Sequence, residues 1–72
     1  MSYVDDVALE LAKLALADAA KAGDDKIVDQ IGEILGASSH TLQESYLTFV
    51  RVRRAEARAR ALLDSRKAKD VG

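Results

Sequence analysis

Residues 38–69 read SSHTLQESYLTFVRVRRAEARARALLDSRKAK and contain neither glycine nor proline. Because nothing in this stretch interrupts a helix, it predicts a single helix over about residues 39–68. At 1.5 Å per residue the whole stretch would be about 48 Å long, whereas a compact domain of this chain length is only about 30 Å across. The helix must therefore project from the domain, lie along two shorter helices, or pack on a partner chain.

Two shorter helices are predicted before it. Over residues 4–22 the apolar side chains recur in two adjacent stripes, which indicates an amphipathic helix wide enough to touch two neighbours. Gly23 is the expected left-handed residue after that helix. Residues 25–35 form the second predicted helix, and Gly36 is expected to end it. The apolar face of the second helix consists of Ile27, Val28, Ile31, Ile34 and Leu35.

The composition favours an all-α fold in one domain, residues 1–72. Apolar residues make up 49% of the chain but only 4% of residues are aromatic, 32% are charged and there is no proline, which is typical of helical proteins. A core of this size is marginal without disulfides, a metal or oligomerisation. With no cysteine and one histidine, we expect neither a disulfide nor a structural zinc site. We therefore expect a helical bundle that is completed by homodimerisation.

The charges are distributed unevenly along the chain. Nine acidic and three basic residues give residues 1–44 a formal charge of −6, whereas eight basic and three acidic residues give residues 45–72 a charge of +5. Such polarity has two explanations. Either the two halves attract each other, within one chain or between chains, or the basic half binds an external anion.

The junction between the second and third helices, residues 31–46, reads IGEILGASSHTLQESY. Gly32 suits a close helix crossing, Gly36 suits a sharp turn with positive φ, and Ser38 suits the N-cap of the next helix. This pattern resembles the helix-turn-helix of bacterial DNA-binding domains, in particular the resolvase-like form. The resemblance covers about a quarter of the chain.

The resemblance implies a DNA-binding site on the third helix. Side chains at the start of that helix would contact base edges, and arginines further along would bind phosphates. The implied base-contacting residues are Ser39, His40 and Gln43, and the implied phosphate-binding residues are Arg51, Arg54 and Arg58. Two residues depart from the pattern: Glu44 would face the DNA with a negative charge, and Ser45 stands where a buried aliphatic residue is usual.

The same arginines have simpler explanations. An arginine series on a helix is often a solvated face or the counterpart of an acidic surface, and isolated exposed ion pairs contribute little. The sequence therefore predicts a small DNA-binding or regulatory protein, with a helical protein–protein adaptor or assembly subunit as the alternative. An arginine-rich RNA-binding segment over residues 51–60 is a third interpretation.

Other function classes have less support. There is no cysteine nucleophile, the one histidine has no carboxylate at a spacing that marks a dyad, and the four glycines form no phosphate-binding loop. We therefore expect neither an enzyme nor a cofactor. No apolar run exceeds four residues, which is too short for a membrane span, and the N-terminal Asp5 and Asp6 do not fit a secretory signal. We expect a soluble, cytoplasmic protein.

Overall fold

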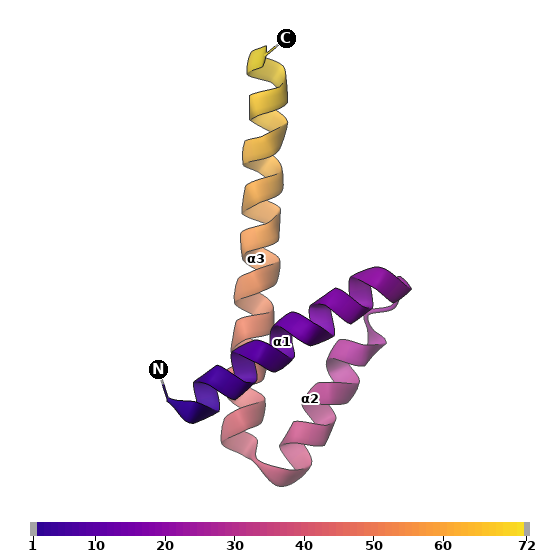
Figure 1. Ribbon diagram of the computed structural model, residues 1–72, viewed down its shortest axis with the longest axis vertical. Coiled ribbons are helices and arrows are strands. Elements are labelled where there is room, and N and C mark those ends of the chain that lie inside the picture. The colour runs from indigo at the N-terminus through magenta and orange to yellow at the C-terminus, as the bar shows by residue number, and fades with distance from the viewer. Residues whose placement is uncertain (1, 72) are drawn as a thin grey trace.

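The computed structural model describes residues 2–71, with side chains described as far as Lys67. This part of the chain forms three helices, α1 (Tyr3–Ala22), α2 (Lys26–Ser38) and α3 (His40–Val71). Helices α2 and α3 form a V, α1 lies across it, and the second half of α3 extends alone beyond the other two helices (Figure 1). The prediction of an all-α fold with two shorter helices and one long basic helix is confirmed.

Local capping explains both ends of α1. The Oγ of Ser2 accepts a hydrogen bond of 3.1 Å from the backbone N–H of Asp5, which satisfies one of the free amides in the first turn. Asp5 and Asp6 lie in the first turn and Lys21 in the last, where each charge is favourable in the field of the helix dipole. Gly23 then adopts the left-handed conformation, with φ 69° and ψ 30°, as the sequence predicts.

The core lies between α1 and the V formed by α2 and α3. Its centre is built from small residues of α1 that face larger side chains of the other two helices. The buried apolar residues are Ala8, Ala12, Ala15, Ala19, Val28, Tyr46 and Val50. Since alanine is small, α1 can approach both neighbours closely, and half-buried leucines and isoleucines flank this centre. Helix α1 thus packs on two helices of its own chain, although Leu14 of its apolar face remains 57% exposed.

The end of α2 differs from the prediction. The helix expected over residues 25–35 runs to Ser38, and Gly36 lies inside it instead of ending it. Within residues 2–71 a positive φ occurs only at Gly23, so Gly36 does not supply the sharp turn expected of it. A glycine is tolerated inside a helix at a cost of about 1 kcal/mol relative to alanine, and here the following residues continue the helix for two more positions.

A single residue, Ser39, connects α2 to α3. Its backbone is extended, with φ −151° and ψ 103°, and its N–H donates a hydrogen bond of 2.7 Å to the carbonyl of Leu35. Its Oγ accepts a hydrogen bond of 3.2 Å from the N–H of Leu42. The N-cap of α3 is therefore Ser39 and not the predicted Ser38.

The two parts of α3 have different surroundings. Residues 40–50 pack on α1 and α2, whereas the side chains of residues 51–67 are exposed except for the half-buried Arg54. We call residues 51–67 the arm and residues 2–50 the body. The structure measures 52 × 29 × 13 Å along its principal axes, and the arm accounts for its elongation (Figure 1). Within the single chain, the long helix projects from the body and does not lie along the two shorter helices (Figure 1).

Candidate functional site

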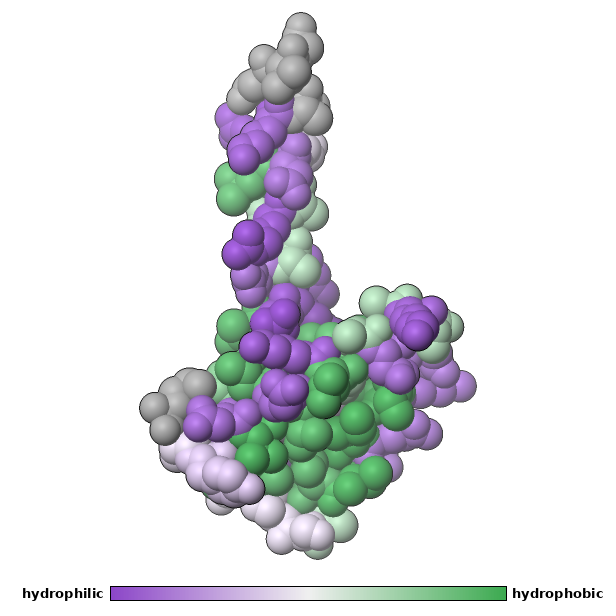
Figure 2. All heavy atoms as spheres, in the orientation of Figure 1, coloured by the Kyte–Doolittle hydropathy of each residue, from purple (hydrophilic) through white to green (hydrophobic). Residues whose placement is uncertain are grey.

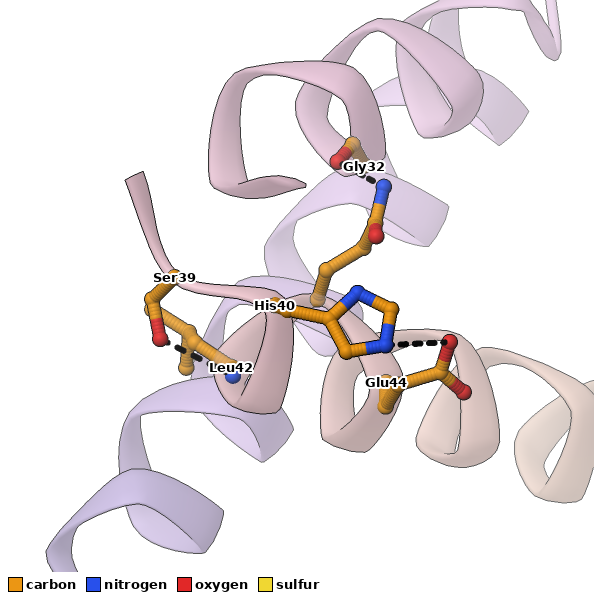
Figure 3. A network of polar contacts seen from close by, with 6 residues as sticks. Gly32, Ser39, His40, Leu42 and Glu44 are labelled. Carbon is orange, nitrogen blue, oxygen red and sulfur yellow. Dashed lines mark hydrogen bonds and ion pairs between the residues drawn. The ribbon is translucent and has the colours of Figure 1, made fainter. Parts of the chain in front are cut away.

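Two of the predicted base-contacting residues lie together where α3 begins (Figure 3). Ser39 is half-buried, and its hydroxyl is engaged as the N-cap. His40 is exposed, and its Nε2 lies 3.7 Å from Oε1 of Glu44 in the next turn. Glu44 is exposed as well, so a carboxylate stands on the surface that an approaching DNA phosphate would meet.

Gln43, the third of these residues, is directed toward α2. Its Nε2 donates a hydrogen bond of 2.9 Å to the carbonyl of Gly32, and a Cβ atom on Gly36 would overlap its amide group. Glycine at position 36 therefore leaves room for Gln43. At Gly32, by contrast, a Cβ would lie 3.6 Å from side-chain atoms of both Leu47 and Tyr46, an ordinary van der Waals distance. The sequence-based explanations of the two glycines were wrong, because the crossing has room for a methyl group and the close approach is at position 36.

The three predicted phosphate-binding arginines share one side of α3 but differ in their surroundings. Arg51 and Arg58 are exposed. The half-buried Arg54 has its Nη2 4.0 Å from Oδ1 of the exposed Asp25, at the start of α2. An ion pair of this length at the surface contributes little to stability. Arg51 and Arg58 are accessible to a binding partner, whereas Arg54 borders the body.

The expected DNA-binding face of α3 is consequently split. By spacing, the exposed face of α3 was expected to run through His40, Gln43, Glu44, Leu47, Arg51, Arg54 and Arg58. Helix α2 packs against part of this face. Gln43, Leu47 and Arg54 are half-buried, while His40 and Arg51 are exposed. The direction from which α2 approaches cannot be read from the periodicity of α3, since that periodicity is the same for any neighbour.

A buried hydrogen bond joins α3 to α2 inside the body. The hydroxyl of Tyr46 donates a hydrogen bond of 2.7 Å to the carbonyl of Val28. Burial raises the pKa of this phenol above its usual value of 10.0, and the nearby Arg54 guanidinium opposes the rise. Among the side chains that the structure describes, every buried nitrogen and oxygen has a hydrogen-bond partner. In the same part of the chain, no three histidine, cysteine or acidic side chains gather closely enough to hold a metal ion.

Large apolar side chains on the arm are exposed to solvent. The exposed fractions are 56% for Val52, 64% for Leu62 and 62% for Leu63. With two alanines between them these residues recur at three-four spacing, which puts them on one side of the helix. We call this surface the arm stripe: Val52, Ala55, Ala59, Leu62 and Leu63. The apolar spacing was visible in the sequence, but its exposure was not.

A second apolar surface lies on α2. A shallow, open groove there, which we call the α2 groove, is lined by Ile27, Gln30, Ile31, Glu33, Ile34 and Ala37. Ile34 is 68% exposed, although its spacing grouped it with the core-facing residues. In Figure 2 the hydrophobic surface gathers over α1 and α2 in the body, whereas the arm is largely hydrophilic. None of the described helices has both the length and the apolar character needed to cross a membrane.

Comparison of the chain with protein-family models, with curated proteins and with solved structures finds no match. A fold of three helices is in any case compatible with many functions, so function has to be argued from the exposed chemistry. Three surfaces carry that chemistry: the start of α3, the arm stripe and the α2 groove.

Proposed function

We propose that this protein is a self-assembling helical subunit that functions through protein–protein contacts of its arm. The observation that carries the proposal is the exposure of Val52, Leu62 and Leu63 on one side of a helix that projects from the body. Burial of apolar surface contributes about 25 cal/mol per Å². Clustered apolar side chains on a projecting helix are therefore typical of an association surface.

The spacing of the arm stripe supports the same function. Apolar residues at three-four intervals are the pattern by which one helix packs along another, and alanines between larger residues permit close approach. The arm holds seven basic and two acidic residues, a formal charge of +5. Complementary charge accelerates association and selects the partner. The arm therefore suits an acidic helical surface with apolar residues at its centre.

Duplex DNA is the second candidate partner, and one observation favours it. Arg51 and Arg58 are exposed on the same side of α3 as the exposed His40, so all three could face one phosphate backbone. Two features oppose DNA binding. The side-chain amide of Gln43 already donates a hydrogen bond to the carbonyl of Gly32, and the exposed carboxylate of Glu44 would repel phosphate. The arm stripe would also have no counterpart on a phosphate backbone.

Sedimentation equilibrium over micromolar to millimolar protein concentrations tests the proposal, together with a titration of labelled random duplex DNA at low salt. We expect concentration-dependent association and no duplex binding. A protein that stays monomeric over the whole range would contradict self-assembly. Duplex binding that weakens steeply with salt would support the second candidate, and Arg51→Ala should then reduce the slope of log K against log salt by about one.

A further inference from the structure

We propose that the arm of one copy packs in the α2 groove of a second copy, and that the contact is reciprocal, so that two copies exchange arms around a two-fold axis. This inference rests on the proposed function: the surface that covers the arm stripe is the α2 groove of the other copy. Each copy has one arm and one groove, so a two-fold arrangement satisfies both surfaces at once, as expected for a closed dimer.

The two surfaces match in kind and in length. The arm stripe extends from Val52 to Leu63, about 17 Å along a helix axis, and the groove extends from Ile27 to Ala37, about 15 Å. Each surface has a largely exposed branched residue near one end, Leu62 at 64% and Ile34 at 68%. Three turns of one helix can therefore lie along three turns of the other, with apolar side chains meeting over the whole length.

Charge distinguishes this arrangement from the packing of two arms on each other. The arm has a formal charge of +5, and residues 2–44 have a charge of −6. Packed helices have their axes about 8–10 Å apart, which is within the screening length of about 10 Å at 0.1 M salt. Two adjacent arms would repel each other, whereas an arm in the groove faces the acidic body, with Glu33 on the groove itself.

Among the side chains described, the arm forms a single ion pair with the body of its own chain. Helix α3 is continuous from His40 and leads the arm away from α1 and α2 (Figure 1). Among the side chains described, the ion pair between arm and body is that of Arg54 with Asp25, at 4.0 Å. The ion pair of Arg60 with Glu56 lies within the arm itself. The opposite charges of the two halves thus remain available to a second copy.

Disulfide cross-linking tests the contact directly, because the chain has no cysteine. A tagged copy with Leu62→Cys is mixed with an untagged copy that carries Ile27→Cys or Ile34→Cys, two positions that lie toward opposite ends of the groove. A disulfide requires Cα atoms within about 7 Å, so we expect a mixed cross-link with one of the two groove positions, according to the direction of the arm. The control is Ala17→Cys, an exposed position on α1, which should give none.

The other outcomes contradict the proposal in distinguishable ways. If Leu62→Cys cross-links mainly to itself, the arms pack on each other, and the groove is overturned while self-assembly stands. If the protein associates but neither groove position cross-links, the groove is overturned as well. A monomeric protein that gives no cross-link would overturn the groove and the proposed function together.

A second measurement does not depend on cysteine geometry. Leu62→Ser and Ile34→Ser remove exposed apolar side chains from the two surfaces, and each is expected to weaken association about tenfold without a loss of helicity. Tyr3→Ser is the matched control, because Tyr3 is 82% exposed and belongs to neither surface. Equal association constants for Ile34→Ser and Tyr3→Ser would overturn the assignment of the groove. Added salt should weaken the association of the wild-type protein.

Discussion

The hydroxyl of Tyr46 donates a hydrogen bond of 2.7 Å to the backbone carbonyl of Val28, and both residues are almost completely buried. This contact joins α3 to α2 across 18 positions of sequence. A second hydrogen bond, from the side-chain amide of Gln43 to the carbonyl of Gly32, joins the same two helices closer to the corner at Ser39. Two side-chain-to-backbone hydrogen bonds thus join α2 to α3.

Tyr46→Phe removes the first of these bonds and retains the ring in the core. We expect the free energy of unfolding to fall by about 0.5–1.5 kcal/mol at neutral pH, the usual net contribution of an intramolecular hydrogen bond. Urea denaturation followed by circular dichroism measures the change. An unchanged midpoint would show that water replaces the bond without cost.

The same variant has a pH-dependent effect. Since burial raises the pKa of Tyr46 in the folded state above 10.0, the folded protein holds this proton to higher pH than the unfolded chain does. Its contribution to stability is fully present below about pH 10 and is lost as the pH rises through the folded pKa. We expect the stability difference between wild type and Tyr46→Phe to narrow above about pH 10. A constant difference up to about pH 11 would contradict this expectation.

Replacing each of the two glycines of α2 by alanine should change the free energy of unfolding by different amounts. Gly32→Ala is expected to raise the free energy of unfolding by up to about 1 kcal/mol, because alanine favours the helix and the new methyl makes ordinary contacts with Leu47 and Tyr46. Gly36→Ala gains the same helix propensity but displaces the amide of Gln43 from its bond to Gly32. Little or no net gain is expected there.

A double-mutant cycle separates these contributions. Gln43→Ala should cost about 0.5–1.5 kcal/mol in the wild-type background, and less in the Gly36→Ala background, where the bond is already broken. Chemical denaturation of the four proteins measures both costs. Equal costs in the two backgrounds would show that Gly36 and Gln43 are independent.

Because Ser39 and not Ser38 caps α3, replacing these two adjacent serines by alanine should cost different amounts of stability. Ser39→Ala removes the hydroxyl that accepts from the N–H of Leu42, so we expect a loss of about 1 kcal/mol. Ser38 is the exposed last residue of α2, and Ser38→Ala should change stability by less than about 0.5 kcal/mol. Thermal melts of the two variants measure the difference. A larger loss of stability for Ser38→Ala than for Ser39→Ala would contradict the assignment of Ser39 as the N-cap.

The alanines of α1 predict a strong dependence on side-chain size. Ala12 is fully buried in the core, so Ala12→Leu forces three additional heavy atoms into a packed contact. The expected loss is about 1–3 kcal/mol. Ala17→Leu, on the exposed side of the same helix, is the matched control and should stay within about 0.5 kcal/mol. Similar melts for both variants would mean that α1 moves outward at little cost.

The sequence by itself determined the number, type and approximate extent of the helices. The uninterrupted run after Ser39, the left-handed position of Gly23 and the amphipathic pattern of α2 depend on residues within one or two turns, so local chemistry specifies them. The projection of the long helix was among the expected arrangements, because its length exceeds the width of the domain. Gly36 was misread by the same local reasoning, since a glycine is compatible with a helix as well as with its end.

Only the tertiary structure decided which side of each helix is covered. Ile34 and Leu35 belong to one amphipathic pattern, yet Ile34 is exposed and Leu35 packs against the core. Gln43 fits an exposed recognition face by spacing, but it donates to a carbonyl 11 positions away. Periodicity shows that a helix has an apolar side, whereas burial depends on where the other helices lie. That position is fixed by contacts between distant residues, such as Tyr46 on Val28, which no local pattern contains.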